Sequence, residues 1–153
     1  MDTVITPQTV HVNVSPLGFH RYATQFAESA AAARSKKFSP VPYFLYCRAL
    51  ELALKAYLLA RGMSKADLKS KFGHDLCKVL AEAKKRGLTG EVTIAAGWDA
   101  EIVKANAYYN GKGFEYFEVD NAARGYPNLP NLDTLADCVS AILAGIKRTC
   151  LKA

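Results

Sequence analysis

The sequence predicts an all-α protein, an up-and-down bundle of four to five main helices that follows an extended N-terminal arm. Apolar residues recur at spacings of three and four along most of the chain, which is the period of an amphipathic helix. The pairs Ser15-Pro16 and Ser39-Pro40 are typical helix starts, with a capping hydroxyl before a proline. One segment, residues 10–14, alternates with the period of a strand, and a lone strand cannot form a sheet.

The length and composition indicate one ordinary domain. A chain of 153 residues buries enough surface for a core, so we expect an arm at residues 1–14 and a single domain at residues 15–153. Hydrophobic residues make up 50% of the chain, but it contains no run of 18 apolar residues, so we expect no membrane span. The first residues lack the basic and apolar regions of a secretion signal, so we expect a cytoplasmic protein.

The cysteines and glycines predict neither a metal site nor a cofactor. No Cys-x-x-Cys pair occurs, and each cysteine stands alone in a helical pattern, so we expect small buried thiols. These cysteines are Cys47, Cys77, Cys138 and Cys150. Gly111-Lys112-Gly113 lacks the preceding strand and following helix of a phosphate-binding loop.

We expect the arm to lie on the bundle or on a neighbouring subunit. Two long helices are predicted after it. The first runs from Pro16 to about Lys36, with aromatic and alanine residues on one face. The second begins at Pro40 and ends at Gly62, which can take the left-handed conformation of a helix cap.

The second helix is apolar on nearly every side and carries one polar stripe. On a helical wheel, Arg48, Glu51 and Lys55 fall within about 60° of one another. A helix of this kind must be covered on most sides, so we place it at the centre of the bundle. The stripe is either a structural ion network or a ligand site, and its spacing favours the network.

Shorter elements follow the central helix. We predict a short polar helix or turn at residues 64–72. The pattern of residues 75–86 predicts an amphipathic helix, which ends at Gly87. The next residues are ambiguous between helix and strand, because Val92-Thr-Ile94 favours a strand and the neighbouring alanines do not. We favour a helix from about Glu91 to Tyr109.

A long aromatic loop, residues 110–130, precedes the last helix. Loops of this length are uncommon in small domains unless they serve a function, so we predict a loop that contacts a partner. Its candidate contact residues are Lys112, Phe114, Tyr116, Arg124 and Tyr126. The last helix starts at about Leu132 and shows one apolar stripe as far as Cys150.

Several of these residues match a known family in order and spacing. They are Glu51-Leu-Ala-Leu-Lys55-Ala, Ala60-Arg61-Gly62, Gly73-His74-Asp75-Leu76, Ala83 to Gly87, Asn106, Tyr109, Lys112, Phe114, Glu115, Tyr116 and Tyr126-Pro127. This pattern resembles the HEPN domain, a small all-α module, over roughly residues 16 to 150. The resemblance implies pairing of two copies and, because such domains often accompany a nucleotidyltransferase in toxin and antitoxin pairs, a protein partner of that type.

The chain departs from the family at the residues that cleave RNA. Many HEPN domains are ribonucleases in which an arginine is followed four to six residues later by a histidine. This chain has histidines at positions 11, 20 and 74, and no arginine precedes any of them at that spacing. The resemblance therefore implies a non-catalytic HEPN-like protein that acts through protein association.

His74 adds to the polar stripe and allows two interpretations. It could be a general acid or base near Glu51, with Lys55 holding an anion. Alternatively, its imidazole bonds the stripe or a helix end and fixes the turn. We favour the second interpretation, because the histidine has no paired nucleophile or metal set. The candidate cluster is Arg48, Glu51, Lys55, His74 and Asp75.

Charge and apolar surface predict two kinds of partner. The net charge of +6 and the pI near 9.2 suit an anionic partner, so the alternative function is RNA binding or processing through basic faces and the aromatic loop. We also expect a homodimer, because the central helix is apolar on more sides than the other main helices of one chain would cover.

Overall fold

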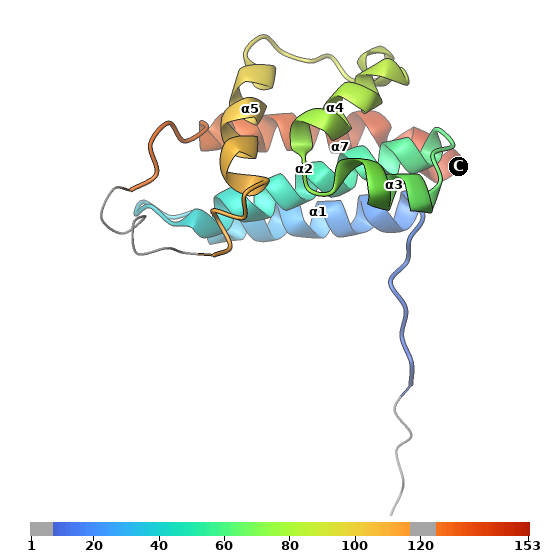
Figure 1. Ribbon diagram of the computed structural model, residues 1–153, viewed down its shortest axis with the longest axis horizontal. Helices are drawn as coiled ribbons and strands as arrows, with labels where there is room; N and C mark the ends of the chain where they lie inside the picture. The colour runs from blue at the N-terminus through green and yellow to red at the C-terminus, as the bar shows by residue number, and fades with distance from the viewer. Residues whose placement is uncertain (1–7, 117–124) are drawn as a thin grey trace, which may run out of the picture.

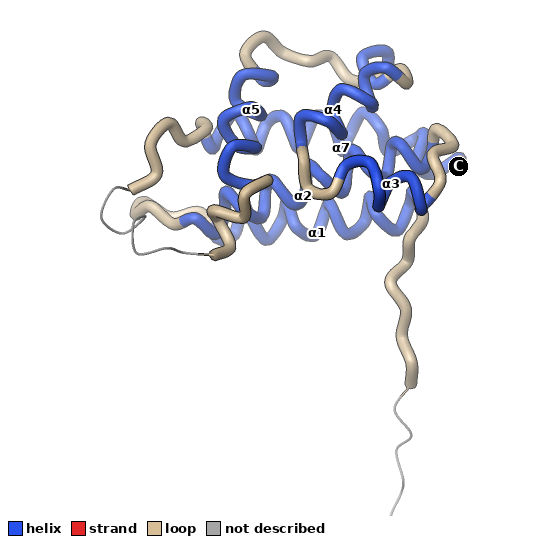
Figure 2. The backbone as a smooth tube through the Cα atoms, viewed as in Figure 1, coloured by secondary structure: helices blue, strands red, loops and turns tan. Residues whose placement is uncertain are grey.

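The computed structural model describes residues 8–116 and 125–153, and in them it confirms the predicted all-α class. The elements are α1 (Pro16–Ala33), α2 (Pro40–Ala60), α3 (Lys65–Phe72), α4 (Leu76–Lys85), the 3-10 helix η1 (Leu88–Gly90), α5 (Trp98–Tyr109) and α7 (Leu132–Lys152). Figure 2 shows helices and loops and no strand in these residues. In the same residues, no helix combines the length and the apolar character needed to cross a membrane.

Three long helices form the body of the molecule, and three shorter ones cover it. Figure 1 shows α1, α2 and α7 lying lengthwise, with α1 antiparallel to α2 and α7 parallel to it. The helices α3, α4 and α5 all pack on α2, and α5 runs across the long helices. The long and short helices together leave α2 at the centre.

The chain covers the central helix by itself. Twelve residues of α2 are buried, among them Leu50, Leu54 and Leu58, which are fully inaccessible. Helices α1, α4, α5 and α7 supply the cover. The reason given above for a homodimer, an apolar central helix left uncovered, is therefore wrong.

The two helix starts predicted from Ser-Pro pairs are correct, and one of the two predicted ends is not. The Ser15 hydroxyl accepts a hydrogen bond from the Gly18 amide at 2.9 Å, and the Ser39 hydroxyl accepts one from Val41 at 3.2 Å. Helix α1 ends at Ala33 rather than near Lys36, because Arg34 takes an extended backbone and forms an ion pair with Asp133 of α7.

The segment before α5 is not the predicted helix from Glu91. Helix α5 begins at Trp98, after Gly97 with a left-handed φ of 91°. The Val92 side chain is buried against α7, where a Cβ on Gly145 would lie 2.5 Å from Val92 Cγ2. Tertiary packing of a β-branched residue thus fixes an irregular backbone here.

The arm leaves the bundle instead of lying along it. Residues 8–14 have no regular structure, and Figure 1 shows them projecting away from α1. Near the body, the Asn13 amide donates to the Tyr22 hydroxyl at 3.0 Å, whereas Val10 and Val12 are 86% and 70% exposed. The first of the two predicted positions for the arm is therefore wrong, and contact with a neighbouring subunit stays a prediction.

Candidate functional site

The candidate site is a polar cluster at Glu51, to which three parts of the chain contribute. On α2, Arg48 and Lys55 lie one turn to either side of Glu51, so all three share one face. His74 lies in the turn between α3 and α4, and Tyr109 is the last residue of α5. The cluster therefore forms where the short helices cross α2.

Glu51 accepts hydrogen bonds from four side chains. Its Oε1 lies 3.1 Å from Lys55 Nζ and 2.8 Å from His74 Nδ1. Its Oε2 lies 2.7 Å from the Tyr109 hydroxyl and also accepts from the Arg48 guanidinium. Glu51 is 0% exposed, and a buried carboxylate is stable when its oxygens are bonded and its charge is balanced.

The four donors keep Glu51 ionised. Burial acts to raise the pKa of Glu51, but Lys55, Tyr109, Arg48 and His74 together lower that pKa below its ordinary value. Burial, and secondarily the charge of Glu51, raises the pKa of Tyr109, so the phenol stays protonated and donates. The cluster is thus one carboxylate anion that accepts from two cations, Arg48 and Lys55, and from two further donors, His74 and Tyr109.

His74 and Lys55 connect the α3–α4 turn to α2. Because the Glu51 carboxylate only accepts, His74 donates through Nδ1, which assigns the proton to that nitrogen. Lys55 Nζ also donates to the Gly73 carbonyl at 2.8 Å. The second interpretation of His74 predicted its bond to the stripe, and the first interpretation also placed His74 near Glu51. Half of the His74 side chain, 49%, is nevertheless exposed.

Asp75 does not belong to the cluster, which corrects its assignment. Its carboxylate caps α4 by accepting from the Lys78 amide at 3.1 Å and from Asn106 Nδ2 at 3.1 Å. Asn106 Oδ1 in turn accepts from the Leu76 amide at 2.8 Å. Asp75 therefore joins α4 to α5.

The sequence analysis did not predict Tyr109 as a member of the site or Asn106 as the partner of Asp75. The two lie three residues apart on α5, where Tyr109 reaches Glu51 and Asn106 reaches Asp75. Neither carries a charge at neutral pH, so a pattern of charged residues does not indicate them. Their occurrence in the family pattern, without an assigned role, was the available signal.

The aromatic loop is partly core. Phe114 is 3% exposed and stacks on Tyr43 with ring centroids 5.6 Å apart, so its prediction as a contact residue is wrong. Tyr126 is half-buried, and its hydroxyl donates to the Gly113 carbonyl at 3.0 Å. Lys112 and Tyr116 are exposed, with the Lys112 ammonium 5.6 Å from the Tyr116 ring centroid. Arg124 lies outside the described residues.

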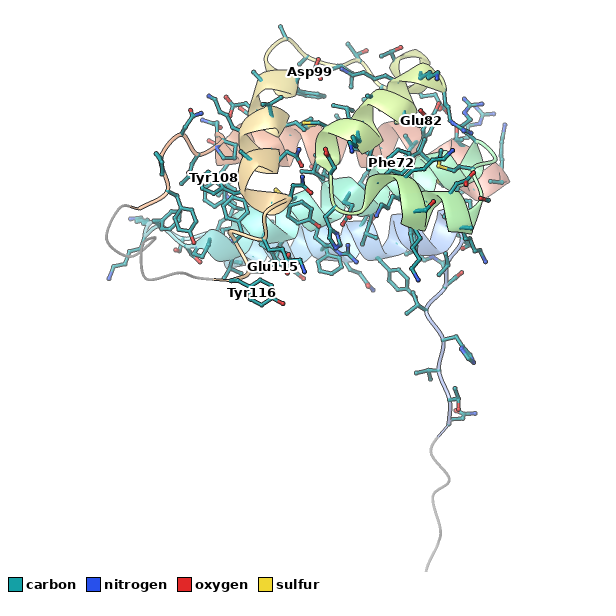
Figure 3. The ribbon with its side chains drawn as sticks, viewed as in Figure 1. Phe72, Glu82, Asp99, Tyr108, Glu115 and Tyr116 are labelled. Carbon is teal, nitrogen blue, oxygen red and sulfur yellow. The ribbon has the colours of Figure 1, made fainter. Side chains whose placement is uncertain are left out.

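Figure 3 shows how this end of the bundle is arranged. Tyr108 lies on the side of α5 that faces the connection between α1 and α2, and Tyr116 lies at the outer edge of the molecule. Tyr108 and Phe114 have ring centroids 5.3 Å apart, and Tyr108 and Tyr126 are equally close. These tilted and edge-on ring contacts thus form a small aromatic cluster around the buried Phe114.

The cysteines of the described residues are free thiols. Cys47, Cys138 and Cys150 are buried, as predicted, and Cys77 is half-buried. Burial raises the pKa of Cys138 to about 12 and that of Cys150 to about 11, so these thiols are protonated and unreactive at neutral pH. Within residues 8–116 and 125–153, no three His, Cys, Asp or Glu side chains gather in a way that could hold a metal ion.

Comparison of the chain with protein-family models, with curated proteins and with solved structures finds no match.

Proposed function

We propose that this protein is a non-catalytic HEPN-like domain that acts through association with other proteins. The HEPN resemblance supports the proposal, as does the lack of an arginine at the ribonuclease spacing before any histidine. The polar cluster supports it too, because Glu51 is committed to four internal donors. His20 is also engaged, since its Nε2 lies 2.8 Å from the Leu143 carbonyl oxygen in the interior.

The arm is the observation that carries the proposal of association. Val10 and Val12 are the most exposed large apolar side chains of the described residues, and they lie in an extended segment. Such a segment presents unpaired backbone groups and apolar side chains that a second chain can cover. We propose a homodimer in which each arm contacts the other copy.

Light scattering coupled to gel filtration tests the homodimer. We expect a mass of about 33 kDa, twice the 16.7 kDa chain, and a shift toward 16.7 kDa in the Val10→Ser, Val12→Ser double variant. Val103→Ser, an exposed valine on α5, is the matched control and should keep the dimer. A stable 16.7 kDa species of the natural chain at high concentration contradicts the proposal.

The family resemblance also supports a nucleotidyltransferase-type protein partner. Co-expression with the product of the neighbouring gene tests this part of the proposal. A nucleotidyltransferase that elutes with the chain at micromolar concentration supports the proposal. Separate elution of the two proteins contradicts it.

A pocket at the α1–α2 connection favours RNA binding as a second candidate function. Its volume is about 280 Å³, and its lining includes Lys36, Lys37, Phe38 and Tyr43. Two lysines suit phosphates, and the Phe38 ring, 56% exposed, offers a face on which a base can stack.

Fluorescence anisotropy with a single-stranded RNA at two salt concentrations tests this second function. Real binding should weaken steeply with salt, with a log-log slope of roughly −0.7 per phosphate contacted, and should vanish in the Lys36→Glu, Lys37→Glu variant. The matched control is Lys78→Glu, Lys85→Glu, which reverses two exposed lysines of α4. No binding at low salt removes the candidate.

A further inference from the structure

A second pocket lies where the arm, α1 and α3 meet against α2. Val14, Phe19, Lys55, Lys65, Leu68 and Lys69 line it, and its volume is about 290 Å³. We call it the lysine-rimmed pocket. Figure 1 shows α3 beside the point at which the arm joins α1. The pocket is separate from the α1–α2 connection.

The floor of the lysine-rimmed pocket is apolar. Leu68 is buried on the inner face of α3, and Val14 and Phe19 are half-buried. A cavity of this volume lies at the lower end of the range for ligand pockets and has room for one large apolar side chain. Apolar surface of this kind gains free energy when a partner removes it from water.

The rim carries two lysines, Lys65 and Lys69, that no acidic side chain of the described residues neutralises. Lys65 and Lys69 are exposed on successive turns of α3, and neither forms an ion pair within the described residues. Lys55 differs, because its ammonium already binds Glu51 and the Gly73 carbonyl. Asp67 lies about 200° around the helix from both rim lysines and pairs with Lys71 at 3.8 Å.

We propose that the lysine-rimmed pocket binds an acidic segment of a protein partner. One large apolar side chain of that segment fills the space above Leu68, and neighbouring carboxylates pair with Lys65 and Lys69. The charge complementarity selects an acidic partner, and the apolar floor has room for one apolar side chain of that partner. This inference rests on the proposed function, protein association, and names the kind of partner.

A peptide library displayed on phage is the probe. Selection on the natural protein should enrich peptides in which Asp or Glu flank a large apolar residue. The Lys65→Glu, Lys69→Glu variant should no longer enrich them, and the milder Lys65→Gln, Lys69→Gln variant should enrich them weakly. Lys78→Glu, Lys85→Glu on α4 is the matched control and should behave like the natural chain.

The best peptide is then synthesised and its affinity measured by fluorescence anisotropy. We expect affinity to fall about tenfold or more in the Lys65→Glu, Lys69→Glu variant, and similarly when the apolar residue of the peptide becomes alanine. Circular dichroism confirms that the variants are folded. Enriched peptides without acidic residues, or equal affinity for the variant, overturn the inference.

Two further outcomes would also overturn it. Tighter binding of a ten-nucleotide RNA than of any selected peptide, lost in the Lys65→Glu, Lys69→Glu variant, would assign the pocket to nucleic acid. A change of mass from dimer to monomer in that variant would assign it to a second copy of this chain. If the mass stays that of a dimer while no acidic peptide binds, this inference fails and the proposed homodimer stands.

Discussion

At the residue scale, Glu51 shows how a charge can occupy the centre of a helical bundle. Burial of an unpaired carboxylate is strongly unfavourable, but two cations and two further donors surround this one. The same bonds join α2, the α3–α4 turn and α5. The cluster therefore specifies how the short helices sit on the long one.

Removal of Glu51 should destabilise the fold. Glu51→Ala leaves the Lys55 and Arg48 charges without their partner, so we expect a loss of about 3–5 kcal/mol in the free energy of unfolding. Glu82→Ala, which breaks a more exposed pair with Arg86, is the control and should lose less than about 1 kcal/mol. Urea unfolding measures both, and equal midpoints for Glu51→Ala and the natural chain would show that the cluster adds no stability.

Low pH should reduce the free energy of unfolding through protonation of Glu51. The pKa of Glu51 is lower in the folded chain than its ordinary value of 4.5, so its contribution is present above that pH and disappears as the pH falls through the folded value. Unfolding free energy between pH 7 and pH 3 should therefore fall more steeply for the natural chain than for Glu51→Gln. Other carboxylates titrate in both proteins, so parallel curves would contradict this role of Glu51.

At the element scale, local rules predicted most helices and tertiary contacts decided the exceptions. Ser-Pro starts, the cap at Gly62 and the apolar stripe of α7 could be read from sequence, because each depends on neighbouring residues. The start of α5 could not, because Val92 is held by α7, far along the chain. The Tyr109 bond to Glu51 spans 58 residues and was missed for the same reason.

Gly145 gives a direct test of the contact that holds the segment before α5. Glycine to alanine inside a helix ordinarily stabilises by about 1 kcal/mol. At Gly145 the new Cβ would lie 2.5 Å from Val92 Cγ2 and 2.8 Å from the Glu91 carbonyl oxygen, so we expect a loss of about 1–3 kcal/mol instead. Ser140→Ala, exposed on the same helix, should be neutral or slightly stabilising. A thermal melt decides the sign, and a stabilised Gly145→Ala protein would show that the segment packs differently.

At the scale of the whole molecule, the chain buries α2 by itself, so α2 is not a surface on which a partner can bind. The apolar central helix is satisfied internally, so partners are left with the surfaces outside it. Those surfaces include the arm and two lysine-bearing pockets, at Lys36 and at Lys65. One predicted contact residue of the aromatic loop, Phe114, is core instead, because aromatic rings in a loop pack on one another when the fold brings them together.

Incubation of the purified protein with total RNA tests most directly whether the cluster is structural and the domain non-catalytic. His74 is bonded to Glu51, and no arginine precedes it at the ribonuclease spacing. We therefore expect no cleavage above that of a mock purification, with or without magnesium. The His74→Ala variant should have a lower free energy of unfolding, because it loses the bond to Glu51, and RNA incubated with it should keep its full length. RNA cleavage that persists through further purification and is lost in a folded His74→Ala variant would contradict the proposal.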